Sequence, residues 1–193
     1  MSVIFTRAPL RISLGGGGTD IPSYYREHGG FLVAEAIDQY VYMLVHTVFQ
    51  RLFRLKYSAF EEVADPADIQ HPILREALRL HWRGAPLEIA SVADIPAGTG
   101  LGSSGTYTVC LLKALAVAGR MVTTPGELAE AECHIEIDVL GEPSGKQDQY
   151  VAAHGGLCAY TFHENDAVTV EPLRVNTETL QRMEDGFLLF FTG

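Results

Sequence analysis

The chain has little of what marks several large classes of protein. It has three cysteines in 193 residues, odd in number and widely spaced, so no disulfide framework is expected and the usage is typical of a reducing cytoplasm. Its 14 basic and 24 acidic residues give a net charge of −10, which argues against an extended nucleic-acid-binding surface but not against a small anionic ligand. No apolar run approaches membrane length. We therefore expect a soluble, cytoplasmic protein that contacts neither nucleic acid nor membrane.

Hydrophobic periodicity predicts helices and strands in one globular domain, which the 47% hydrophobic and 20% charged composition allows. Strands are expected at residues 3–6, 11–14, 31–36, 40–49, 52–57, 87–92, 155–162 and 187–191. Helices are expected at residues 21–28 with Asp20 as N-cap, at 69–82, at 104–118 closed by Gly119, and after Thr124 and Pro125. Because helices and strands do not alternate strictly, an α+β fold is favoured over a doubly wound sheet.

The end of the chain reads as a strand without a successor. Residues 187–191 are entirely apolar, and the sequence stops at Gly193. A buried strand normally leads to another element, so we expect a cut between two domains at least as readily as a natural terminus.

The strongest functional signal is residues 94–105 (DIPAGTGLGSSG), a glycine-rich turn between a strand and a long helix. One interpretation is a plain turn with a serine N-cap. A second is a dinucleotide fingerprint, since Gly100, Gly102 and Gly105 match GxGxxG, but no strand ending in an acid follows about 20 residues on. A P-loop fails because no Lys-Ser/Thr pair follows the glycines. What remains is a phosphate-binding turn of another design, in which helix amides and serine hydroxyls hold phosphate.

The pattern Pro96-x-x-x-Gly-Leu-Gly-Ser-Ser104 resembles the ATP signature of the GHMP kinases, the superfamily of galactokinase, homoserine kinase, mevalonate kinase and phosphomevalonate kinase. Gly105 stands where alanine is common. The resemblance implies an α+β fold of the ribosomal protein S5 domain 2-like type. It also implies that ATP is bound by Pro96, Gly98, Gly100, Leu101, Gly102, Ser103 and Ser104.

Residues 8–20 (APLRISLGGGGTD) are similar to the first galactokinase motif. The resemblance places Arg11 near the transferred phosphate and gives Asp20 hydrogen bonds from sugar hydroxyls. The sequence departs at Gly17 and Gly18, where galactokinases carry Glu and His, and the missing carboxylate would no longer repel a substrate phosphate. The run GGGGTD most resembles D-glycero-D-manno-heptose 7-phosphate kinases, which phosphorylate the anomeric hydroxyl. The implied substrate-binding residues are Gly16, Gly17, Gly18, Thr19 and Asp20.

A third segment adds acidic groups. Glu132 and Glu136 lie one helical turn apart, a spacing that by itself is typical of a solvated surface. Residues 141–149 (GEPSGKQDQ) nevertheless resemble the family segment that holds the catalytic aspartate, which is Asp148 here. The resemblance makes Glu136 a magnesium ligand together with Ser104. One extra residue before Asp148, relative to mevalonate kinases, leaves the local geometry open.

The chemistry implied by the resemblance is phosphoryl transfer, which depends on positioning and charge neutralisation. Asp148 would act on the attacking hydroxyl, either as a base or as an electrostatic guide, and Arg11 would balance the charge of the transferred phosphoryl group. Lys146 is a candidate contact for a substrate phosphate or, equally, a surface lysine. The seven histidines are scattered and contain no HExxH pattern, so no zinc site is expected.

The resemblance therefore implies a sugar kinase that uses ATP and Mg²⁺. Residues 1–193 would be its N-terminal ATP-binding domain, with a second, ferredoxin-like domain absent and activity reduced for that reason. The expected partners are ATP and a sugar or sugar phosphate, and a homodimer is compatible with the sequence. The alternatives are a kinase for fucose, galactose or sedoheptulose 7-phosphate, and a non-catalytic nucleotide- or sugar-binding module.

Overall fold

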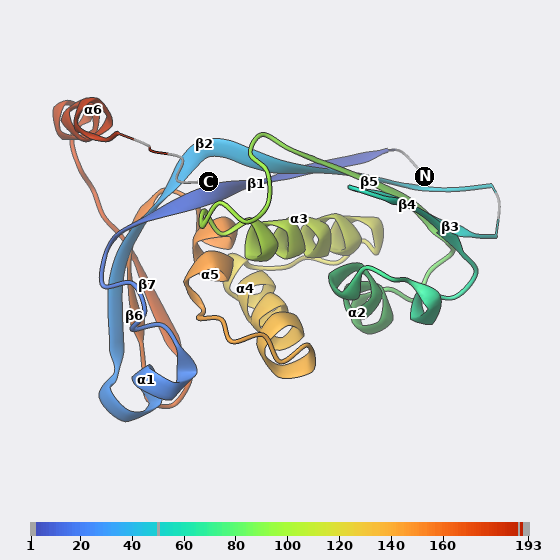
Figure 1. Ribbon diagram of the computed structural model, residues 1–193, viewed down its shortest axis with the longest axis horizontal. Coiled ribbons are helices and arrows are strands. Elements are labelled where there is room, and N and C mark those ends of the chain that lie inside the picture. Colours follow the sequence, from blue (N-terminus) through green and yellow to red (C-terminus); the bar gives the residue numbers. More distant parts are fainter. Residues whose placement is uncertain (1–2, 50, 189, 191–193) are drawn as a thin grey trace.

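The computed structural model describes residues 3–49, 51–188 and 190. One mixed sheet forms a curved layer, and four helices, α2 to α5, cover one of its faces (Figure 1). The expected α+β class is confirmed. None of the helices in this described part of the chain combines the length and apolar character that a membrane span requires.

The sheet has seven strands among the described residues, in the order β4-β3-β5-β2-β6-β7, with β1 paired to β2. All pairs are antiparallel except β3 with β5. The strands are β1 (Ile4–Gly15), β2 (Gly30–Thr47), β3 (Phe53–Lys56), β4 (Phe60–Val63), β5 (Leu87–Ala93), β6 (Leu157–Phe162) and β7 (Val168–Pro172). The sequence did not predict β4 or β7.

Two long strands replace four expected short ones. The register of β1 on β2 shifts between Pro9 and Arg11, where residues 37–39 of β2 are not paired with β1. Proline has no N–H to give to a ladder, so an irregularity at this point keeps the strand continuous while allowing it to bend. The first half of β2 then pairs with β6 and the second half with β5. The prediction of separate strands was wrong because bulge residues looked like a break.

The helices are α1 (Pro22–His28), α2 (Pro72–His81), α3 (Ser103–Ala118), α4 (Pro125–Cys133), α5 (Gln147–His154) and α6 (Thr177–Gly186), with a 3-10 turn at Pro66–Asp68 and a π-helical turn at His134–Val139. The expected α3 and its closing Gly119 are confirmed, and α4 opens with a full capping box of Thr124 and Glu127. Asp20, however, is not the cap of α1: Ile21 occupies that position, and no side chain caps the helix. The sequence did not predict α5 or α6.

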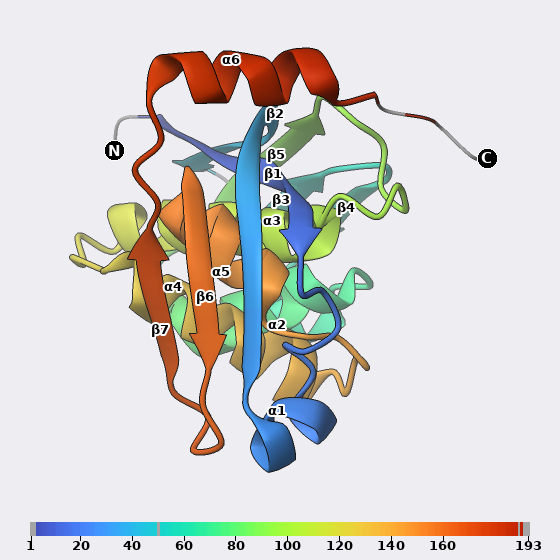
Figure 2. The same ribbon diagram turned by 90° about the vertical axis from the view of Figure 1, so that its left-hand side faces the viewer.

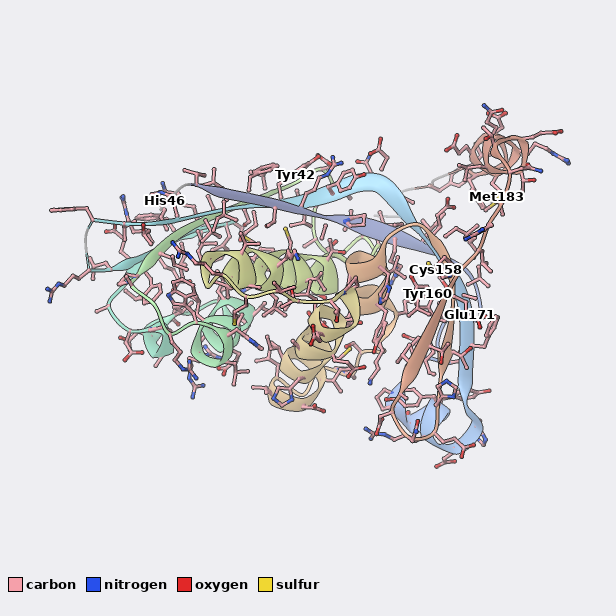
Figure 3. The ribbon with its side chains drawn as sticks, turned by 180° about the vertical axis from the view of Figure 1, so that it is seen from behind. Tyr42, His46, Cys158, Tyr160, Glu171 and Met183 are labelled. Carbon is pink, nitrogen blue, oxygen red and sulfur yellow. The ribbon has the colours of Figure 1, made fainter. Side chains whose placement is uncertain are left out.

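The core lies between the sheet and the helix layer. Helix α3 is apolar on nearly all sides and fully buried at Leu111, Ala114 and Leu115. A second apolar cluster packs α4 and α5 against β2 and β6. The opposite face of the sheet carries exposed aromatic side chains, among them Phe5, whose ring stacks on Tyr42 at 5.9 Å; Figure 3 labels Tyr42. Packing of the helix layer on the sheet thus holds one end of α3 against β1, and the candidate functional site lies at this end.

The expected strand at residues 187–191 is not present in its described part. Residues 187, 188 and 190 lie outside regular structure, and 189 and 191 fall outside the described residues. They follow α6, which crosses the end of the sheet away from the other helices (Figure 2). The amphipathic pattern of residues 177–186 after Asn176, which accepts from the Thr179 amide, explains why this segment is helical.

Candidate active site

The glycine-rich turn is fixed between strand β1 and helix α3. The Arg11 amide donates to the Leu101 carbonyl at 3.1 Å, and the Thr106 hydroxyl donates to the Pro9 carbonyl at 3.1 Å. Three glycines of the turn have positive φ, which other residues rarely adopt: Gly98 (83°), Gly100 (75°) and Gly102 (79°). The first amides of α3 have no partner inside the helix, so the turn presents donors and a helix dipole at its end.

Arg11 of β1 and Asp148 of α5, which are 137 residues apart in the sequence, form an ion pair at this turn. Nε and Nη2 of Arg11 lie 2.7 and 2.6 Å from Oδ1 of Asp148, and Nη1 donates to the Gly100 carbonyl at 2.7 Å. A Cβ at Gly102 would come within 3.1 Å of the Asp148 carboxyl carbon, so the absence of a side chain there is what lets the pair approach. Asp148 stands on the first turn of α5, a helix that sequence patterns missed.

The electrostatics of Asp148 follow from two opposing effects. Burial raises the pKa of its carboxyl group, and the charge and hydrogen bond of Arg11 oppose that rise. The Asp148 side chain is still 27% exposed, so a ligand can reach it. A carboxylate that is partly desolvated and held by one guanidinium is suited to accept a hydrogen bond from a hydroxyl group.

A cleft of about 600 Å³ opens beside this pair. Five of the seven residues predicted to bind ATP line it: Gly98, Gly100, Gly102, Ser103 and Ser104. The Ser103 hydroxyl is buried without a hydrogen-bond partner among the described residues. Pro96 and Leu101 do not line the cleft. Leu101 packs on Leu10 and Val41 and so anchors the turn instead.

The other end of the cleft is aromatic, which the sequence did not indicate. The ring of His71 stacks on Tyr107 with centroids 5.4 Å apart and meets the edge of Tyr57 at 4.8 Å. Burial lowers the pKa of His71, which favours the neutral ring, and His71 also caps α2 by accepting from the Leu74 amide. A neutral aromatic wall and a polar glycine turn therefore face one cleft.

Glu136 lies beside Ser104, the second residue of α3. Glu136 is 3% exposed and lies in the π-helical turn after α4, a feature that often marks functional sites. Burial raises the pKa of Glu136, and the side chains of Glu132 and Ser104 offset part of this rise. Gln149 of α5 contacts the same carboxylate, with Nε2 3.5 Å from its Oε2. The structure thus brings Arg11, Ser104, Glu136 and Asp148 to one end of α3.

Glu132 is a completely buried carboxyl group beside Glu136. Burial, with the charge of Glu136 next in size, raises the pKa of Glu132 to about 10. The prediction that this pair forms a solvated surface was one of two alternatives, and the burial of both side chains excludes it. Among the described residues no three His, Cys, Asp or Glu side chains cluster as a complete metal site. Mg²⁺ commonly takes one or two carboxylates and completes its shell with substrate phosphates and water, so the residues present fit it.

The glycine run of residues 15–18 is held by its own neighbours. Oδ1 of Asp20 accepts from the Gly18 amide at 3.1 Å and Oδ2 from the Gln147 amide at 3.0 Å, and the residue is only 4% exposed. The Thr19 hydroxyl lies 2.8 Å from the Gly16 carbonyl and accepts from the Phe31 amide at 3.0 Å. Asp20 therefore ties the run to the segment that carries Asp148. Sugar contacts by Gly16, Gly17, Gly18, Thr19 and Asp20 stay a prediction.

The structure does not bring Lys146 to the Arg11–Asp148 pair. Its ammonium group is 3.2 Å from Glu130 and donates to the Asp166 carbonyl at 3.0 Å, and its side chain is 8% exposed. This environment fits neither a surface lysine nor a free phosphate contact, although the predicted role stays untested.

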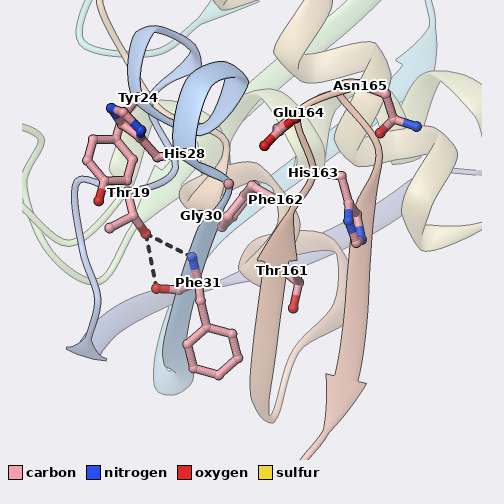
Figure 4. Close-up of a pocket in the computed structure, with 11 residues that line it drawn as sticks. Thr19, Tyr24, His28, Gly30, Phe31, Thr161, Phe162, His163, Glu164 and Asn165 are labelled. Carbon is pink, nitrogen blue, oxygen red and sulfur yellow. Dashed lines mark hydrogen bonds between the residues drawn. The ribbon is translucent and has the colours of Figure 1, made fainter.

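A second hollow of about 760 Å³ lies at the far end of the sheet, near α1 and the β6–β7 turn. Figure 4 shows Tyr24, His28 and Phe31 around it, together with the Thr19 hydrogen bonds. It is an open surface, and none of the four residues that meet at α3 lines it. We therefore place the candidate active site in the cleft beside the glycine turn.

The segment that carries the glycine turn is similar to a known protein family. A model of the GHMP kinases N terminal domain matches residues 70–156, which include the glycine turn and Asp148. A D-glycero-alpha-D-manno-heptose 7-phosphate kinase of Campylobacter jejuni is 30% identical over 206 aligned residues, covering 100% of this chain and 60% of that protein. Residues 70–156 are therefore similar to the N-terminal domain of the GHMP kinases.

Two further proteins are similar at slightly lower sequence identity. The crystal structure of a D-glycero-D-manno-heptose 1-phosphate kinase from Bacteroides thetaiotaomicron superposes with a TM-score of 0.87 and 28% identity, covering 95% of this chain and 63% of that one. An L-fucokinase/L-fucose-1-P guanylyltransferase of Bacteroides fragilis is 27% identical over 99% of this chain and 24% of its own length. The chain thus spans about 60% of the length of the heptose phosphate kinases that it matches.

Proposed function

We propose that this GHMP kinase domain binds ATP and takes part in phosphorylating the anomeric hydroxyl of a heptose 7-phosphate-like sugar. The observation that carries the proposal is the ion pair of Arg11 and Asp148 at the N-terminus of α3. It sets an acceptor for a hydroxyl proton beside a turn suited to phosphate.

The nucleotide would lie along the cleft. Its triphosphate would meet the amides and hydroxyls of residues 98–104, and its base the aromatic wall of His71 and Tyr107. Bound at Glu136 and Ser104, Mg²⁺ would neutralise phosphate charge.

In the transfer step the sugar hydroxyl oxygen bonds to the terminal phosphorus of ATP, and the bond from that phosphorus to the bridging oxygen breaks, leaving ADP. The hydroxyl proton moves to Asp148 or, if Asp148 acts only as a guide, to solvent. Arg11 holds the Asp148 carboxylate in place and adds positive charge near the transferred group. These residues account for positioning and charge, which phosphoryl transfer chiefly needs.

The test is a coupled assay of ADP release with a panel of acceptors, made on the complete natural protein. The panel includes heptose 7-phosphate, heptose 1-phosphate, fucose, galactose and sedoheptulose 7-phosphate. We expect the highest kcat/KM with heptose 7-phosphate. Preference for fucose, favoured by the similarity to a fucokinase, would replace the substrate but keep the reaction. Binding of ATP without transfer to any acceptor would instead indicate a non-catalytic module.

A further inference from the structure

Glu132 is an ionisable side chain that is fully buried, and no cation is paired with it among the described residues. Its exposed fraction is 0%, and neither carboxyl oxygen has a hydrogen-bond partner of good geometry among the described residues, although the side chains of Gln149 and Glu136 approach it. A buried carboxyl group left without partners costs a folded protein free energy, so such a group needs an explanation.

The neighbours of Glu132 are also oxygen-rich. The carboxylate of Glu136 is the charged group that acts on it most strongly, and the amide of Gln149 lies beside both. Gln149 is 1% exposed and its Oε1 has no donor among the described residues. Gln149 is a second, independent indication that a ligand is bound here. Its amide N–H contacts Glu136, whereas its amide oxygen, buried in the same cluster of side chains, has no donor in the described part of the chain.

The two basic side chains already described near the site are paired to other groups. Arg11 is committed to Asp148 and the Gly100 carbonyl, and Lys146 to Glu130 and the Asp166 carbonyl. Two adjacent buried carboxylates repel each other strongly unless a cation lies between them or one of them takes up a proton. Oxygen-rich surroundings of this kind suit a hard divalent ion.

We propose that Glu132 supplies a second carboxylate to the divalent-cation site of Glu136 and Ser104, with the Gln149 carbonyl oxygen oriented toward the same ion. The inference rests on the proposed function, since the ion would also carry the phosphates of ATP. It adds a metal ligand on α4 that lies one turn before the expected one.

The competing explanation is a neutral Glu132 that only donates a hydrogen bond to Glu136. The two differ in what the isosteric substitution Glu132→Gln does. A glutamine keeps the shape, one oxygen and a hydrogen-bond donor, but loses the negative charge. If Glu132 is a metal ligand, this variant should bind the metal more weakly. If Glu132 is only a hydrogen-bond donor, metal binding should be unchanged.

The experiment measures binding of Mn²⁺ by electron paramagnetic resonance in the complete protein, in the presence of a non-hydrolysable ATP analogue. We expect Glu132→Gln to weaken Mn²⁺ binding about 10- to 100-fold, the range typical when an interaction supporting a bound metal is lost. Asp138→Asn is the matched control. Asp138 lies in the π-helical turn that also carries Glu136, but its side chain is 62% exposed and is paired to His134. Thermal unfolding without metal shows whether each variant is folded.

The outcomes separate the two claims. Weaker Mn²⁺ binding in Glu132→Gln but not in Asp138→Asn supports the inference. Equal binding in Glu132→Gln and the unsubstituted protein, or equal weakening in both variants, overturns it while leaving the proposed function in place. Failure of the unsubstituted protein to bind the ATP analogue at all would overturn both.

Discussion

The molecule has two glycine-rich loops that look alike in sequence and differ in structure. The turn at residues 98–102 borders an open cleft, and a Cβ at Gly98 or Gly100 would meet nothing within 4 Å. The run at residues 15–18 is packed at Gly16, where a Cβ would lie 2.1 Å from the Phe31 carbonyl oxygen. Glycine is used in the first loop to admit a ligand and in the second to admit the chain itself. The comparison predicts that changes at the cleft alter chemistry and that changes at the run alter stability.

The largest effect should come from the cleft. Asp148→Asn removes the proton acceptor but keeps the shape, so we expect kcat to fall by about 10²- to 10⁴-fold, the usual worth of a general base. The affinity for an ATP analogue, measured by calorimetry, should stay within about threefold, since general acid–base chemistry acts in the transition state rather than in binding. Asp138→Asn serves as control on an exposed carboxylate. Unchanged kcat in Asp148→Asn would remove Asp148 from the reaction.

The next effect concerns the packed run. Gly16 has φ of +83° and a backbone oxygen where its Cβ would lie, so Gly16→Ala should lower the free energy of unfolding by about 2–4 kcal/mol. Gly15→Ala is the matched control, because its Cβ would meet nothing within 4 Å and its φ is not positive. We expect that control to change stability by less than about 0.5 kcal/mol. Denaturant unfolding measures both, and equal stabilities for the two variants would contradict the comparison.

The sequence predicted the glycine turn that lines the cleft better than it predicted the long-range contacts that hold this turn in place. Local signals found α3, its glycine turn and the cap at Thr124, because glycine, serine and threonine act on the backbone next to them. They wrongly made Asp20 a helix cap, because its partners include an amide 127 residues away. They also ended a strand at residues 37–39, where the structure has a bulge within one continuous strand.

The remaining site residues were out of reach for a related reason. The wall formed by His71 and Tyr107 depends on α2 packing against α3, and nothing near either residue in sequence reports that contact. Glu132 carried a signal, the i,i+4 pair with Glu136, but only burial separates a surface pair from an internal one. Positions set by long-range packing therefore appear only once the fold is known.

Within the cleft, a smaller effect separates crowding from strain. Gly98 and Gly102 share a positive φ, so alanine strains the backbone at either position. Only at Gly102 would the new Cβ press on Asp148, at 3.1 Å, and on Arg11, at 3.3 Å. We expect Gly102→Ala to lower kcat/KM by about tenfold more than Gly98→Ala, because displacing the proposed catalytic pair by a fraction of an ångström is costly. Steady-state kinetics on both variants decides this, and similar losses would show that strain alone matters.

The smallest effect is a pH shift confined to the cleft. Burial raises the pKa of Asp148, and a base must be ionised to act, so kcat/KM should rise with pH through a value above the usual aspartate pKa of about 3.9. Arg11 opposes the rise, so Arg11→Met should move this acidic limb to higher pH as well as lowering the rate. Gly15→Ala, outside the cleft, should leave the limb where it is. A limb that stays fixed in Arg11→Met would mean that the titrating group is not Asp148, and would leave the pair as a positioning device whose charge does not tune a base.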